Sequence, residues 1–101
     1  MADPATIGGA LARALTAYEA LTSLGEHVED EWSYVADLSS AWVQRLGEVV
    51  SGRGAEPAAP AASAAIDRVI DEVGRIRDPH RAIDWLSTFP QVVLVAVGER
   101  P

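Results

Sequence analysis

The sequence predicts an all-α fold: a long N-terminal helix, then two or three shorter helices, in a helical bundle completed by oligomerisation. From Ile7 to Val49, apolar and small residues recur at alternating steps of four and three, the spacing of a coiled-coil seam. Later apolar residues also follow helical spacing, between prolines and glycines that fit helix ends. With 101 residues, the chain is expected to form a single helical domain over residues 1–101.

The long helix is expected over residues 4–51. Asp3 and Pro4 fit its start, because an Asp side chain can cap a helix and proline suits the first turn. Gly25 costs about 1 kcal/mol in a helix interior, so the helix could be kinked or broken there. Because the seam spacing continues past Gly25, we expect one continuous helix. The alternative is a second helix that starts near Glu26.

The apolar stripe of this helix is wider than a two-stranded coiled coil requires. Leu15, Val43 and Val50 flank the seam on one side, and Leu24 and Leu38 flank it on the other. Such a width suits a helix that packs inside a bundle.

An Ala/Pro-rich linker is expected over residues 52–62, in an extended and semi-rigid form. The next helix is expected over residues 63–77, with Ser63 as its cap or with Pro60 in its first turn. Its apolar stripe consists of Ile66, Val69, Ile70, Val73 and Ile76.

Two short helices are expected after this point, over residues 79–88 and 90–97. Asp78 can cap the first helix, and Pro79 fits its first position. Pro90 is expected to end the first helix and to begin the second. The β-branched residues of the last segment also suit a strand. We favour a helix, because a single strand in a helical chain has no partner.

Composition and charge exclude several classes of protein. The net charge is −7 and all eight basic residues are arginines, which argues against nucleic-acid binding. No apolar run approaches the ~20 residues that span a bilayer. The absence of cysteine excludes disulfides and cysteine-based zinc sites. The first residues lack the features of a signal peptide, so we expect a cytoplasmic bacterial protein.

Signatures of catalysis are missing, which favours a non-enzymatic protein without a catalytic residue or a cofactor. The sequence contains neither a Walker-type phosphate loop nor a Gly-x-Ser-x-Gly motif. Glu29 and Glu31 flank the seam, and His80 and Asp84 are four residues apart, so these four are candidate metal ligands. Their spacing does not match the Glu-x-x-His pattern of di-iron bundles, and we favour a solvated surface for them.

The seam is expected to be an interface between copies of the chain. The later helices are too short to cover a rod of about fifty residues, so an antiparallel homodimer would bury the stripe. Large aromatic side chains on the seam are also favoured as interface anchors. The expected interface residues are Tyr18, Leu21, Val28, Trp32, Val35, Trp42 and Leu46.

The favoured functional hypothesis is an accessory subunit, adaptor or regulator that dimerises and binds a protein partner. The acidic surface of the chain would suit a basic partner. One alternative is a carboxylate-rich bundle that binds metal for redox or storage chemistry. Another is a pocket for an aromatic or apolar small molecule, lined by Tyr18, Trp32 and Trp42.

Overall fold

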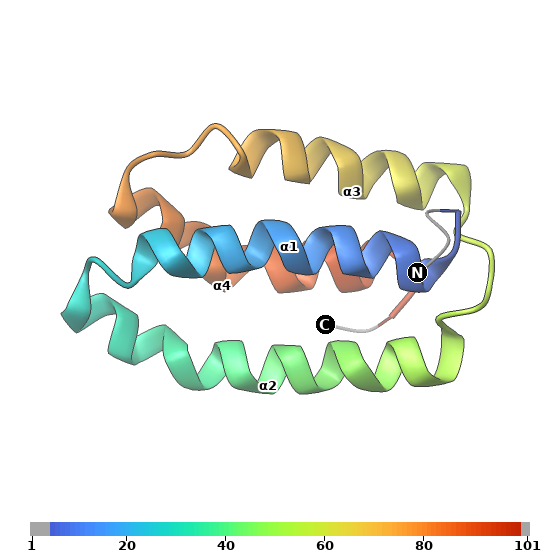
Figure 1. The fold of residues 1–101 in the computed structure, drawn as a ribbon, viewed down its shortest axis with the longest axis horizontal. Helices are drawn as coiled ribbons and strands as arrows, with labels where there is room; N and C mark the ends of the chain where they lie inside the picture. Colours follow the sequence, from blue (N-terminus) through green and yellow to red (C-terminus); the bar gives the residue numbers. More distant parts are fainter. Residues whose placement is uncertain (1–4, 100–101) are drawn as a thin grey trace.

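Residues 5–99 fold into four helices, each antiparallel to the one before it, as the computed structural model in Figure 1 shows. The structure describes the backbone of residues 5–99 and the side chains of residues 5–28 and 40–99. The helices are α1 (Ile7–Gly25), α2 (Glu29–Arg53), α3 (Pro60–Val73) and α4 (Pro79–Ala96). No strand occurs within residues 5–99, so the prediction of an all-α fold is confirmed for this part of the chain.

The prediction of one continuous helix over residues 4–51 is wrong, because the chain reverses direction after Gly25. The amide groups of Glu26 and Val28 bond the carbonyls of Thr22 and Gly25, both at 3.0 Å, and close the last turn of α1. Gly25 is buried, and a Cβ atom added there would lie 3.1 Å from the Ile83 Cδ1 and from the Leu86 Cδ1. The glycine therefore accommodates side chains of α4 at the end of α1.

Helices α1 and α4 form the central pair of the bundle, and the other two helices lie on either side of them. Helix α3 packs against α1 and α4, and helix α2 packs against the same two helices from the opposite side. Residues of all four helices meet in one core. Its most completely buried large side chains are Phe89, Leu11, Leu21, Ile66 and Val93.

The segment between α2 and α3 is shorter than predicted, because α2 continues to Arg53 and α3 begins at Pro60. Pro60 in the first turn was one of the two starts that the sequence allowed, and Ser63 is not the cap. The linker also bonds the start of α1. The amide of Ile7 donates to the Glu56 carbonyl at 2.9 Å, and the amide of Ala58 donates to the Ala5 carbonyl at 2.8 Å.

Helix α4 is one helix where the sequence predicted two. The helical assignment of the last segment is confirmed, but Pro90 lies inside α4 and does not end it. Proline removes one main-chain hydrogen bond in a helix interior. Burial of Phe89 and Val93 on either side of Pro90 favours continuation of the helix. After α4, Gly98 has a φ of 84°, a left-handed conformation that glycine adopts at little energetic cost at the end of a helix.

Candidate functional site

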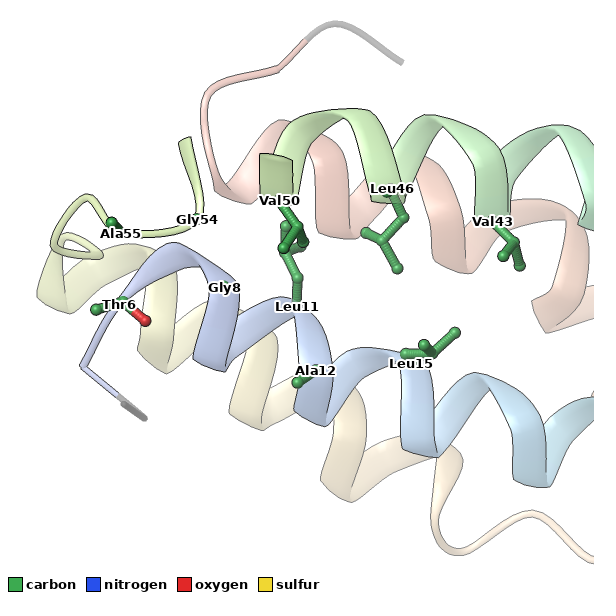
Figure 2. Close-up of a pocket in the computed structure, with 11 residues that line it drawn as sticks. Thr6, Gly8, Leu11, Ala12, Leu15, Val43, Leu46, Val50, Gly54 and Ala55 are labelled. Atoms are coloured by element: carbon green, nitrogen blue, oxygen red, sulfur yellow. The ribbon is translucent and has the colours of Figure 1, made fainter. Parts of the chain in front are cut away.

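An apolar groove runs between α1 and α2 and is the main candidate site among the described residues (Figure 2). It has a volume of about 640 Å³. A second hollow of about 540 Å³ lies next to it between the same two helices and shares Leu15 and Val43 of its lining, so the two hollows are described together as one groove. We call this the α1–α2 groove. Its first part is lined by Thr6, Gly8, Leu11, Ala12, Leu15, Val43, Leu46, Gly47, Val50, Gly54 and Ala55.

Helical spacing explains why this lining is apolar. Val43, Leu46 and Val50 are separated by three and four residues, so they share one face of α2 and point toward Leu11 and Leu15 of α1 (Figure 2). Leu11 and Leu46 are buried at the bottom of the groove. Val43 and Val50 are 44% and 42% exposed. The two valines therefore offer apolar surface that the chain itself does not cover.

One end of the groove is formed by main chain, where the start of α1 meets the end of α2. The amide of Gly8 donates to the Gly54 carbonyl at 2.9 Å. A Cβ atom added to Gly8 would lie 2.9 Å from that same oxygen. Only a residue without a side chain allows this approach, so Gly8 fixes the distance between the two helices at this end.

The other end of the groove is acidic. The second hollow is lined by Glu19 and Glu26 of the α1 region, together with Thr22, Ser40 and Gln44. Both carboxylates are exposed, and neither forms an ion pair with the residues that the structure describes. None of the described residues that line the groove is basic. The groove thus changes from apolar to negatively charged along its length.

Gly47 is a further unusual feature of the groove wall. It lies in the interior of α2, where glycine costs about 1 kcal/mol relative to alanine. An added Cβ would have no neighbour within 4 Å. Packing within the described part of the chain therefore does not require a glycine at position 47.

Four of the seven residues that the sequence predicted for an interface lie in the core of a single chain. Tyr18, Leu21, Trp42 and Leu46 are buried against the other helices. Val28 is half-buried against the same core. The side chains of Trp32 and Val35 lie outside the described residues. The need for a second copy rested on an uncovered seam, and these four positions do not support it.

Two of the three aromatic residues predicted to line a small-molecule pocket, Tyr18 and Trp42, lie in the core, and the side chain of Trp32 lies outside the described residues. The Tyr18 and Trp42 rings have centroids 4.4 Å apart, and Phe89 lies 6.0 Å from the first and 6.1 Å from the second. The indole Nε1 of Trp42 is buried without a hydrogen-bond partner among the described residues. Tyr18 and Trp42 therefore pack directly against each other with ring planes tilted by 50°, and Tyr18 also lines the second hollow.

The candidate metal ligands are not brought together by the described structure. His80 and Asp84 are both exposed, one turn apart on α4. The side chains of Glu29 and Glu31 lie outside the described residues. Among the side chains that are described, no group of three or more histidines and carboxylates could hold a metal ion. No described helix is both long enough and apolar enough to cross a membrane.

Comparison of the chain with protein families, with curated proteins and with solved structures finds no match. The site must therefore be interpreted from its own residues. The sequence carried one signal of the groove, since Leu15, Val43 and Val50 flank the seam on the same side. It could not identify the groove, because the reversal after Gly25 places α1 and α2 face to face.

Proposed function

We propose that the protein is a non-enzymatic interaction protein, an accessory subunit, adaptor or regulator, that binds a protein partner in the α1–α2 groove. The exposed pair Val43 and Val50 is the observation that supports this proposal most directly. Contiguous exposed apolar surface on a small domain is typical of an interaction site. Val95 is the other large apolar residue that is exposed in the described part of the chain, and it does not line the groove.

The chemistry of the lining favours binding over catalysis. Glu19 and Glu26 are the charged side chains among the described lining residues, and both lie at one end. The hydroxyl groups of Tyr18, Thr22 and Ser40 line the same hollow, but no histidine, lysine or arginine lies among the described lining residues to activate them. Covering the exposed parts of Val43 and Val50 would contribute about 1 kcal/mol each to the binding free energy. The groove therefore offers affinity and shape, without reactive groups.

The sequence-based hypothesis also proposes that the chain dimerises. If it does, the α1–α2 groove is a surface that a second copy could cover. A second copy of the chain is one protein that could cover Val43 and Val50. A different protein and an apolar small molecule are the other possible occupants. These three differ in what becomes attached to a photo-reactive group placed in the groove.

Crosslinking in the native cell tests the proposal. Benzoylphenylalanine in place of Val43 should give one discrete protein adduct on irradiation, which mass spectrometry then identifies. The matched control has the same amino acid in place of Val95, which is 58% exposed on α4. A protein adduct from position 43 that is absent from position 95 supports the proposal. Equal adducts from both positions, or no protein adduct from position 43, would contradict it.

A further inference from the structure

We infer that the occupant of the α1–α2 groove is an amphipathic α-helix of a partner protein, seated with basic residues against Glu19 and Glu26. This inference rests on the proposed function and specifies the partner. Four observations support it: the length of the groove, the way that α3 already packs, the small residues of the groove, and its charge.

The length of the groove matches a helix of several turns. Its lining on the α1 side extends from Gly8 to Glu26. At 1.5 Å per residue, this distance is about 27 Å, the length of a helix of about 18 residues. A groove of this length with apolar side chains on both walls is the usual receptor for the apolar stripe of a helix.

Helix α3 shows how such a helix would pack. It is a 14-residue amphipathic helix that contacts both α1 and α4 and buries Ile66 and Val73. An exposed ion pair, with the Arg13 Nη2 3.2 Å from the Asp67 Oδ1, joins it to α1. On the other side of α1, the α1–α2 groove has no covering helix within the described residues. A partner helix there would be the counterpart of α3.

Small residues in the groove allow a partner backbone to come close. Ala12 is exposed on α1, and Gly47 lies between Val43 and Val50 on α2. Packing inside the described chain does not explain this glycine, since no atom lies within 4 Å of the position that a Cβ would occupy. Gly52 is equally open but lies outside the groove lining, so the significance of Gly47 depends on its place in the groove, where the absent side chain leaves room for a partner backbone.

The charge of the groove gives the partner helix a direction. Glu19 and Glu26 are two turns apart on the α1 side, and no described lining residue is basic. The chain as a whole carries a net charge of −7. Lys or Arg in the turns of the partner that lie at this end would form charge-assisted contacts, and acidic residues there would be repelled.

A displayed library of peptides of about 20 residues tests this inference. Apolar residues are fixed at helical spacing, and the remaining positions vary among Lys, Glu, Gln and Ala. Selection on the full-length protein should enrich peptides with Lys near one end. On the double variant Glu19→Arg/Glu26→Arg the enriched charge should change to Glu. The control Glu72→Arg on α3, outside the groove, should leave the Lys preference unchanged.

Gly47 supplies an independent test with the peptide selected on the unchanged protein. Gly47→Ala should weaken binding of this peptide about tenfold while raising the temperature of unfolding. Gly52→Ala is the matched control, because Gly52 also lies in α2 with nothing near its missing Cβ, but outside the groove lining. This control should leave the peptide affinity unchanged.

The outcomes separate this inference from the proposed function. Selection that enriches no helical peptide, or a charge preference that does not reverse on the double variant, would overturn the inference. A protein adduct at position 43 would still support the proposed function in that case. An adduct that joins two copies of this chain would also overturn the inference, because the occupant would then be a second copy.

Discussion

Gly8 and Gly25 are two positions at which α1 approaches other parts of the chain closely, and they differ in what an added side chain would contact. At Gly8, an added Cβ would contact the main chain of Gly54. At Gly25, it would contact the ends of the Ile83 and Leu86 side chains, which can rotate away. Main chain held by a hydrogen bond cannot move in this way. The two glycines are therefore expected to differ in their tolerance of substitution.

Gly8→Ala should lower the free energy of unfolding by about 2 kcal/mol, because the new methyl group forces α1 away from the end of α2. Gly25→Ala should cost less than Gly8→Ala, since flexible side chains can absorb the strain. Urea unfolding followed by circular dichroism measures both changes. Equal stability of the Gly8→Ala variant and the unchanged protein would show that the close approach of Gly8 and Gly54 is absent in solution.

At the scale of elements, α2 is held by fewer helices than α1 or α4, because it contacts these two and not α3. Charged groups after α4 add to its attachment. The Glu99 carboxylate pairs with the Arg45 guanidinium at 3.2 Å and with the Arg53 guanidinium at 2.5 Å. Arg53 also donates to the Val97 carbonyl at 3.1 Å. These contacts tie the end of α4 to α2, which forms one wall of the groove.

Glu99→Ala should lower the free energy of unfolding by about 1 kcal/mol, a value reduced by the partial exposure of both arginines. The loss should become smaller at high salt, which screens the ion pairs of the unchanged protein. Chemical denaturation at low and high salt provides the measurement. Asp67→Ala is the control, because its single ion pair with Arg13 is exposed and should contribute little. A Glu99→Ala loss that is the same at both salt concentrations would argue against an ionic role.

The elements differed in how far the sequence could predict them. The start of α4 was predictable, because the Asp78 side chain accepts from the His80 amide at 3.1 Å, as a cap should. The break after Gly25 was not, because a stripe of apolar residues specifies which positions are buried and leaves helix continuity open. The groove depends on that break. The sequence therefore indicated that Leu15, Val43 and Val50 are on the same side of the seam, but not that they line a groove between two helices.

At the scale of the whole molecule, the apolar core is formed within one chain, so the fold is expected to be stable without a second copy. Core residues come from all four helices and include Leu11 of α1, Trp42 of α2, Ile66 of α3 and Phe89 of α4. A long exposed rod would have required a second copy to bury its apolar side. Among the side chains that the structure describes, the hairpin of α1 and α2 buries the apolar side against the chain's own helices.

The purified protein should therefore unfold cooperatively at a temperature that does not depend on its concentration. Folding that is coupled to association would give a midpoint that rises with concentration. Differential scanning calorimetry over about a hundredfold range of concentration distinguishes the two cases. A rising midpoint would mean that a second copy contributes to the stability of the fold.

The hairpin of α1 and α2 is tied at both of its ends. Residues 26–28 join the helices covalently at one end, and the Gly8 amide bonds the Gly54 carbonyl at the other. The bond from Ile7 to the Glu56 carbonyl adds to the second tie. The two walls thus belong to a closed frame that resists spreading. Because the groove walls are ordered before the ligand binds, little conformational entropy is lost on binding. A modest area of apolar contact can then give a measurable binding free energy.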